Sequence, residues 1–214
     1  MPKSFALRAH CRQDVCAPSV RWRVFCAIEL PEAVQQRVIR HIVRLKGAAP
    51  DAQASWSRAD NIHLTLKFLG DIPPASVQNL SEAASRSVAG IARFTIRLEQ
   101  TGVFPPHGSP RVLWIGVNDC EGKLGELHTR LEGESEKAGF PRESRAFHPH
   151  ITLARLRKPQ HARAVASAHK TTQFEPIEIA VSELLVIRSE LSNAGSKYTT
   201  ISRHPLATSM SDML

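Results

Sequence analysis

Two short segments of this 214-residue chain, HLTL at residues 63–66 and HITL at residues 150–153, share one pattern and lie in opposite halves of the sequence. Each places a histidine two residues before a threonine, with apolar residues at the other two positions. Because side chains alternate along a β-strand, histidine and threonine point to one face and the apolar residues to the other. Each segment therefore predicts a strand that is anchored in a core and offers an imidazole and a hydroxyl on its open face.

The full pattern is rare enough to carry information. With 10 histidines and 10 threonines, about 0.5 instances of His-x-Thr are expected by chance. The third instance, His169-Lys170-Thr171, is therefore interpreted as a coincidence. Requiring apolar residues at both remaining positions lowers the expectation to about 0.08. Two such segments, one in each half, indicate a paired site.

The sequence around these segments predicts a mixture of strands and helices. Apolar alternation or apolar runs predict strands at 23–30, 62–69, 94–98, 112–117, 150–156, 177–181, 183–188 and 197–202. Helical apolar spacing predicts helices at 32–46, 75–89, 123–138 and 161–168. The halves repeat the order strand-helix-strand without strict βαβ alternation. This favours an α+β fold with largely antiparallel sheets, arranged as two similar lobes.

Composition restricts the class of protein. Hydrophobic residues make up 42% and charged residues 22%, which is typical of a globular protein. We expect no membrane span and no secretory signal, because long apolar runs are missing from the sequence. The four cysteines form no CxxC pair, so a zinc site has no framework and a reduced, cytoplasmic protein is expected. The formal charge of +8 favours a polyanionic partner such as RNA, although many basic proteins bind no anion.

Three parts of the chain are expected. Residues 1–20 are basic and contain prolines and cysteines but no clean amphipathic pattern, so we expect a flexible extension. Residues 21–204 are expected to form one bilobal domain. Residues 205–214 are expected to be a loose tail.

Two histidines on facing strands suit displacement at phosphorus. Such a reaction needs a base for the attacking oxygen and an acid for the leaving oxygen, and a pair of imidazoles can hold one neutral and one protonated ring near neutral pH. Threonine hydroxyls can donate hydrogen bonds to the phosphate oxygens. His63 and His150 are therefore the candidate catalytic residues, and Thr65 and Thr152 the candidate phosphate-binding residues. This chemistry requires no metal and no cofactor.

With their flanks, the two segments resemble a known family. HLTLKFLG at 63–70 and FHPHITLAR at 147–155 resemble the paired motifs of the 2H phosphoesterase superfamily, and within it the bacterial RNA 2′,3′-cyclic phosphodiesterases, also called 2′-5′ RNA ligases. The first strand, Trp56 and RVLWIG at 111–116 fit the same branch. The resemblance covers roughly residues 21–204. It implies two pseudo-symmetric lobes, each a small antiparallel sheet backed by helices, with an active-site cleft between them.

The resemblance also implies roles for the four site residues. His63 would donate a proton to the leaving 3′ oxygen, and His150 would accept a proton from the attacking water. Thr65 and Thr152 would hold the phosphate, and the product would be a 2′-phosphate. With the 5′-hydroxyl of an RNA end in place of water, the same site would form a 2′-5′ linkage.

Two cationic residues near the segments are candidate substrate contacts. Lys67 shares the alternation face of His63 and could contact phosphate or RNA, with a solvated strand lysine as the alternative. Arg155 lies an odd number of residues from His150, so simple alternation places it on the opposite face. A bulge or the strand end could return it to the site, and the resemblance implies an arginine there.

Two functions besides RNA cyclic phosphate hydrolysis stay open. One is a phosphodiesterase for another 2′-5′ or small cyclic phosphate substrate, and the other is an RNA-binding module without turnover. Phe68 and Trp114 could stack on bases or pack in the core, and His148 is expected to be structural. RNA is the expected partner, with no membrane association and no obligate protein partner, and the chain is expected to be a monomer.

Overall fold

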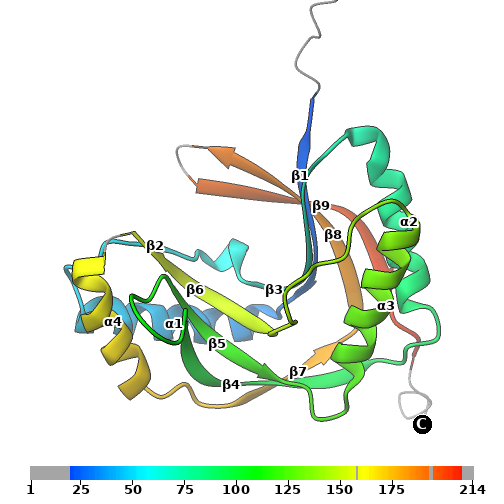
Figure 1. Ribbon diagram of the computed structural model, residues 1–214. Coiled ribbons are helices and arrows are strands. Elements are labelled where there is room, and N and C mark those ends of the chain that lie inside the picture. Colours follow the sequence, from blue (N-terminus) through cyan, green and yellow to red (C-terminus); the bar gives the residue numbers. More distant parts are fainter. Residues whose placement is uncertain (1–19, 158, 193–194, 209–214) are drawn as a thin grey trace, which may run out of the picture.

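Two antiparallel sheets with helices on their outer faces make up the computed structural model, which describes residues 20–157, 159–192 and 195–208 (Figure 1). The strands are β1 (Trp22–Glu29), β2 (Ala54–Trp56), β3 (His63–Ile72), β4 (Phe94–Phe104), β5 (Val112–Asn118), β6 (His150–Leu156), β7 (Ile177–Val181), β8 (Glu183–Ser192) and β9 (Gly195–Pro205). The helices are α1 (Glu32–Ala48), α2 (Val77–Val88), α3 (Lys123–Lys137) and α4 (Pro159–Thr171), with the 3-10 turns η1 (Ala59–Asn61) and η2 (Pro74–Ser76).

The strand order in the first sheet is β3-β1-β8-β9, and in the second it is β2-β6-β5-β4-β7. Every ladder in these sheets is antiparallel, which confirms the predicted α+β class. The sheets do not coincide with the two halves of the sequence. The last two strands of the chain complete the first sheet, and β2 from the first half forms an edge of the second.

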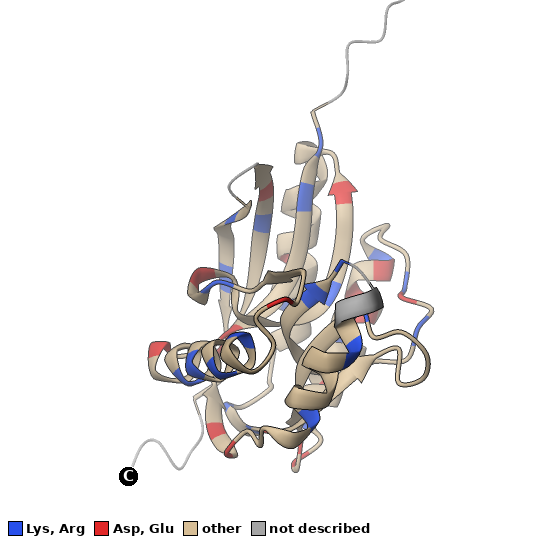
Figure 2. Cartoon of the chain, turned by 90° about the vertical axis from the view of Figure 1, so that its left-hand side faces the viewer, with Lys and Arg blue, Asp and Glu red and all other residues tan. Residues whose placement is uncertain are grey.

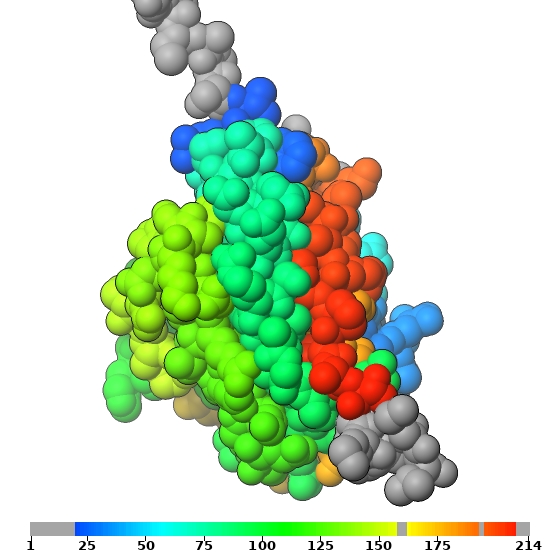
Figure 3. Space-filling view, turned by 90° about the vertical axis from the view of Figure 1, so that its right-hand side faces the viewer, coloured from blue at the N-terminus to red at the C-terminus, as the bar shows by residue number. Residues whose placement is uncertain are grey.

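The helices cover the sheets in pairs. Helices α2 and α3 pack together over the first sheet, and Figure 3 shows α3, α2 and the edge strand β9 side by side on one face of the molecule. Helices α1 and α4 pack together on the side of the second sheet (Figure 1). Each helix buries one apolar stripe. In α1, for example, Val34, Val38, Ile42 and Leu45 are buried at the predicted helical spacing. No helix in the described part of the chain is long and apolar enough to span a membrane.

A one-residue bulge follows the His-x-Thr pattern in both segments. Along β3, Thr65 pairs with Ala27 and Lys67 with Cys26, so Leu66 has no cross-strand partner. Along β6, the residue after Thr152 is skipped in the same way, because Thr152 pairs with Trp114 and Ala154 with Leu113. After each bulge the alternation of faces is shifted by one residue.

The folded chain continues past the expected end of the domain. Strand β9 reaches Pro205, Leu206 is 3% exposed, and the backbone N–H of Ala207 donates to the carbonyl of Ile91 at 2.8 Å. The predicted start of the loose tail, residue 205, is therefore too early in the sequence, because residues 205–207 still belong to β9 or bond to the segment before β4. The expected extension falls almost entirely on residues 1–19, which lie outside the described part, as do residues 209–214.

Candidate active site

His63 lies at the start of β3, where two aromatic side chains contact its ring. Its ring stacks on Phe25 of the neighbouring strand, with centroids 4.7 Å apart, and meets Tyr198 of β9 edge-on at 5.3 Å. Phe25 and Tyr198 also contact each other at 5.1 Å. Three strands of the first sheet therefore fix the plane of this imidazole.

His150 has a similar environment on the second sheet. Phe104 of β4 meets its ring edge-on at 5.1 Å, and Trp114 of β5 lies at 6.4 Å. Strand β3 of the first sheet contacts β6 of the second, so the two segments come together where the sheets meet. Each histidine thus rests on aromatic side chains from neighbouring strands of its own sheet.

Hydrogen bonding fixes which nitrogen of His150 is available for chemistry. Its Nδ1 donates to the backbone carbonyl of His148 at 2.6 Å, so Nε2 carries the lone pair of the neutral ring. Nδ1 of His63 is buried and makes no well-aligned hydrogen bond to any described group. The nearby carbonyl of Asn61 still favours its protonated form.

Burial makes both imidazoles weak bases in the free protein. Desolvation lowers the pKa of His63 from 6.5 to about 4, against the opposing effect of the Asn61 carbonyl. Desolvation also lowers the pKa of His150, opposed by its bond to the His148 carbonyl and assisted by the charge of Arg155. Both rings are therefore neutral at pH 7, and an anion bound between them would favour protonation.

The two threonines lie on the same faces as the histidines. Along both strands the pattern is half-buried histidine, buried aliphatic residue, half-buried threonine, buried aliphatic residue. The hydroxyls of Thr65 and Thr152 have no hydrogen-bond partner among the described residues. The site therefore contains two imidazoles and two hydroxyls that can bind and protonate a compact anion.

The chain also matches a known protein family. A family model described as the 2′-5′ RNA ligase superfamily matches residues 30–193. The chain belongs to this superfamily.

Relatives in the superfamily align over most of their length. The RNA 2′,3′-cyclic phosphodiesterase of Methanothermobacter thermautotrophicus is 34% identical over 83% of this chain and 95% of its own. The Escherichia coli protein of the same name is 30% identical over 86% and 96%. Among solved structures, TT0787 of Thermus thermophilus superposes with a TM-score of 0.70 at 29% identity, covering 87% of this chain and 98% of that one. LigT of E. coli, complexed with 3′-AMP, superposes with a TM-score of 0.69 at 28% identity, covering 88% and 100%.

Lys67 does not lie on the site face, and this prediction was wrong. The bulge at Leu66 turns Lys67 away from His63, and its side chain is buried against α3. Its Nζ donates to Glu132 Oε2 at 2.7 Å and to the carbonyl of Pro141 at 2.8 Å. A buried lysine bonded in this way neither contacts a substrate phosphate nor lies in solvent, which were the two alternatives considered. In this chain the lysine instead links β3 to α3.

The same bulge on the other strand has the opposite effect on Arg155. Simple alternation placed Arg155 off the site, and the shift of one residue returns it to the face of His150. It is exposed, and its charge adds to the lowering of the pKa of His150 by burial and opposes the rise that burial causes in the pKa of Tyr198. At the equivalent position on β3, Phe68 is 49% exposed and lies under the Arg23 guanidinium at 4.6 Å.

Several site residues could not be found from sequence patterns. Phe25, Phe104 and Tyr198 reach the histidines through strand pairing between distant parts of the chain, which no local spacing reveals. Tyr198 is the single tyrosine of the chain, which was the one available signal. Burial raises its pKa, so its hydroxyl keeps its proton and can donate a hydrogen bond. Trp114, for which stacking and core packing were both considered, is half-buried beside His150.

The third His-x-Thr sequence lies on α4 and not on a strand, in agreement with its interpretation as a coincidence. His169 is fully buried, and its Nε2 donates to the carbonyl of Trp114 at 3.0 Å. Its Nδ1 lies 3.3 Å from Nε2 of the buried His41, and Nδ1 of His41 lies 3.3 Å from the Arg44 guanidinium. The Arg44 guanidinium can only donate a hydrogen bond and the Trp114 carbonyl can only accept one. Each of the two rings is therefore neutral and carries its proton on Nε2.

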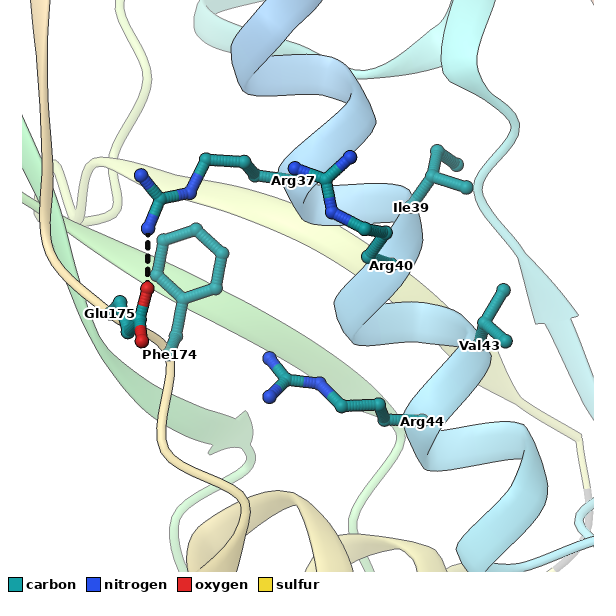
Figure 4. Close-up of a pocket in the computed structure, with 7 residues that line it drawn as sticks. All are labelled: Arg37, Ile39, Arg40, Val43, Arg44, Phe174 and Glu175. Carbon is teal, nitrogen blue, oxygen red and sulfur yellow. Dashed lines mark hydrogen bonds and ion pairs between the residues drawn. The ribbon is translucent and has the colours of Figure 1, made fainter.

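A basic cavity of about 610 Å³ lies on the outer surface of α1, away from the paired segments (Figure 4). Arg37, Arg40 and Arg44 point into it from one side of the helix, and Glu175 pairs with Arg37 at 2.8 Å. The basic positions along α1 are visible as blue stretches in Figure 2. This cavity contains neither a site histidine nor a site threonine and belongs to a different surface.

Proposed function

We propose that the chain hydrolyses RNA 2′,3′-cyclic phosphate ends to 2′-phosphates as an RNA 2′,3′-cyclic 3′-phosphodiesterase. The observation that carries this proposal is the matched pair of His-x-Thr faces on two contacting strands of different sheets. The names of its relatives, which are 30–34% identical, support the substrate class. Its charge of +8 suits a polyanionic substrate.

In this mechanism His150 acts as the base. Its Nδ1 is committed to the His148 carbonyl, so Nε2 can accept a proton from water as the water oxygen attacks phosphorus. His63 takes up a proton when the phosphate anion binds and transfers it to the departing 3′ oxygen. The P–O3′ bond breaks, the new P–O bond forms, and the phosphate stays on the 2′ oxygen.

The remaining side chains hold the phosphate during this exchange. Thr65 and Thr152 donate hydrogen bonds to its non-bridging oxygens, and Arg155 contributes positive charge from the same face. If the attacking oxygen is a 5′-hydroxyl, the same transfers join two RNA ends by a 2′-5′ linkage. In the opposite direction, the 3′-hydroxyl attacks and the 5′ oxygen leaves.

The test is incubation of the protein, with EDTA present, with a short RNA ending in a 2′,3′-cyclic phosphate. We expect a 2′-phosphate end, identified by mass and by resistance to 3′-nucleotidase. A 3′-phosphate end would keep a two-histidine phosphoesterase but reverse the acid and base assignments. Loss of activity in EDTA would contradict the metal-independent mechanism.

Variants separate turnover from binding. His63→Gln and His150→Gln should each abolish turnover, while His107→Gln, in an exposed loop, should leave it unchanged. RNA binding by a wild-type protein that shows no turnover would indicate a binding module. Turnover confined to mononucleoside cyclic phosphates would indicate a small cyclic phosphate substrate.

A further inference from the structure

The basic cavity of about 610 Å³ lies between α1 and the segment that precedes β7. Figure 4 shows Arg37, Arg40 and Arg44 projecting from α1 toward this segment, which carries Phe174 and Glu175. These three arginines are called the arginine stripe below. With three arginines and one glutamate, the cavity lining has a net charge of +2. Its volume is within the range of ligand-binding sites.

The spacing of the arginine stripe is unfavourable for the helix itself. Positions 37, 40 and 44 are three and four residues apart, so the guanidinium groups are neighbours on the helix surface and repel each other. After Glu32, α1 contains no acidic residue that could offset this repulsion. An anion bound across the stripe would replace the repulsion with attraction.

Neighbouring groups orient two of the three arginines and leave the third open. Glu175 pairs with Arg37 at 2.8 Å, and Nδ1 of the buried His41 lies 3.3 Å from the Arg44 guanidinium. Arg40 is exposed and makes no hydrogen bond or ion pair with the residues that the structure describes. A guanidinium group presents a planar fork of donors that fits two phosphate oxygens at once. The stripe therefore offers one open fork between two that are already oriented.

The length of the stripe suits consecutive phosphates of one nucleic-acid strand. Arg37 and Arg44 are seven residues apart, which is about 10 Å along the helix axis. Successive phosphates of a stacked strand lie about 3.4 Å apart along its axis, so three of them can face three arginines. Beside the stripe, Val43 is 59% exposed and can contact a ribose or a base. A single small anion would use only part of this surface.

The stripe also begins near the proposed active site. Glu29, at the end of β1, is the cross-strand partner of His63, and α1 begins three residues later. Three steps of at most about 3.8 Å and five helical residues of about 1.5 Å each place Arg37 within about 25 Å of His63, between Cα atoms. A stacked strand covers this distance with roughly seven nucleotides.

We propose that the arginine stripe binds backbone phosphates of the RNA strand, several nucleotides away from the end that reacts, as a second RNA site. This inference rests on the proposed function, which supplies an RNA strand with one end at His63 and His150. Phosphate contacts position a strand without reading its sequence. The stripe therefore increases affinity for long RNA of any sequence, and a mononucleoside substrate does not reach it.

The first test measures binding without turnover. A fluorescent single-stranded RNA of about 12 nucleotides with a 3′-hydroxyl end is titrated by anisotropy against the wild type and Arg37→Gln/Arg40→Gln/Arg44→Gln. Each phosphate contact of a single strand contributes about 0.7 to the steepness with which log K falls with log salt concentration, so the triple variant should lose about 2. Between about 50 and 200 mM salt, the wild type should lose roughly 15- to 20-fold more affinity than the triple variant.

A matched triple variant removes the same charge from another surface. Arg86→Gln/Arg130→Gln/Arg142→Gln changes three exposed arginines that pair with glutamates on α3. Its salt dependence should equal that of the wild type. An equal decrease in both triple variants would show that only net charge matters and would overturn the proposal. Arg40→Gln, which removes no described contact within the fold, should lower the steepness by about 0.7.

The second test compares turnover of a long and a short substrate. One is an RNA of about 12 nucleotides with a 2′,3′-cyclic phosphate end, and the other is a mononucleoside 2′,3′-cyclic phosphate. The stripe variant should raise KM for the long RNA by about tenfold at low salt, since three exposed ionic contacts each contribute a factor of about two. Its kcat/KM for the mononucleoside should equal that of the wild type. An unchanged KM for the long RNA, or an equal loss for both substrates, would overturn the proposal.

Binding and turnover separate this inference from the proposed function. If neither substrate is turned over but the stripe variant loses salt-dependent RNA binding, the stripe is kept and the enzyme activity is rejected. Turnover of both substrates with identical RNA binding by wild type and stripe variant would keep the activity and reject the stripe.

Two further ligands test the class of anion. A polyglutamate of about 12 residues and AMP are titrated against the same proteins. We expect both to bind more weakly than the RNA. If either binds as tightly as the RNA and loses the same affinity in the stripe variant, the ligand is an acidic peptide or a free nucleotide and the proposal is overturned.

Discussion

The Nζ atom of Lys67 and the Oε2 atom of Glu132 lie 2.7 Å apart, with side chains that are only 2% and 7% exposed. This ion pair joins β3, directly after its His-x-Thr segment, to α3. The carbonyl of Pro141 and the backbone N–H of Glu143 bond to the same pair, so the segment leading to β6 is held as well. One buried ion pair therefore fixes β3 to α3 and to the start of the segment that leads to β6.

Removing the lysine alone should destabilise the fold. Lys67→Met leaves the buried carboxylate of Glu132 without its cation, which typically costs about 3–5 kcal/mol in the free energy of unfolding. The double variant Lys67→Met/Glu132→Leu removes both charges and should lose less than the single variant. Urea unfolding of the wild type, both single variants and the double variant checks this. Additive losses would show that the two groups do not interact.

The pH dependence of turnover should reflect the two lowered pKa values. The proposed mechanism needs His63 protonated and His150 neutral. Because His63 has the lower pKa in the free protein, this form is a minority of the singly protonated protein, and its fraction peaks between the pKa of His63, about 4, and that of His150, below 6.5. The optimum of kcat/KM should therefore lie below pH 6.5. Bound phosphate favours protonated His63, so the alkaline limb of kcat should lie at higher pH than that of kcat/KM. A kcat/KM optimum above pH 7 would contradict the neutral state of both rings in the free protein.

Arg155 should contribute more to substrate binding than an exposed cation away from the proposed site does. Arg155→Gln removes a cation from the site face and should raise KM for cyclic phosphate ends by about 10- to 100-fold, the range for a charged hydrogen bond. Arg142→Gln removes an exposed cation on the α3 side and is the control. Steady-state kinetics at two salt concentrations check both. An equal rise in KM in the two variants would mean that only overall charge matters.

The buried pair His41 and His169 should make the protein less stable in mild acid. Burial lowers the pKa of His41 to about 4 and also lowers that of His169. Between pH 6.5 and about 4 the unfolded chain binds protons that the folded chain does not, so stability falls as pH falls. Each such proton contributes a slope of at most about 1.4 kcal/mol per pH unit.

His41→Gln tests this assignment. A glutamine amide can still donate to Nδ1 of His169 but does not titrate, so the slope of unfolding free energy against pH should decrease by up to one proton. Urea unfolding at several pH values measures the slope, with His107→Gln as the exposed control. An unchanged slope in His41→Gln would show that the pKa of His41 does not differ between the folded and unfolded protein.

Local periodicity predicted most of the fold. Both His-x-Thr strands and the four helices follow from spacing that is visible in one segment at a time, and the antiparallel class follows from the order of the predicted elements along the chain. The three residues of β2 were missed because so short a strand has no detectable period. The assignment of β8 and β9 to the first sheet was also missed, since it depends on long-range pairing.

The candidate site was predicted where it depends on alternation, and missed where alternation breaks. His63, Thr65, His150 and Thr152 precede the bulges and lie where a regular strand would place them. Lys67 and Arg155 follow the bulges, so regular alternation assigned each of them to the wrong face. A bulge depends on the partner strand and has no reliable signal in the strand that contains it.

The matched bulges divide each strand into two parts that serve the proposed site in different ways. Ahead of the bulge, the proposed reaction requires the histidine and the threonine. Behind it, one position returns to the same face, and here it holds phenylalanine on one strand and arginine on the other. A substitution at Phe68 or Arg155 should therefore change what the proposed site binds while it leaves the residues proposed to transfer protons in place.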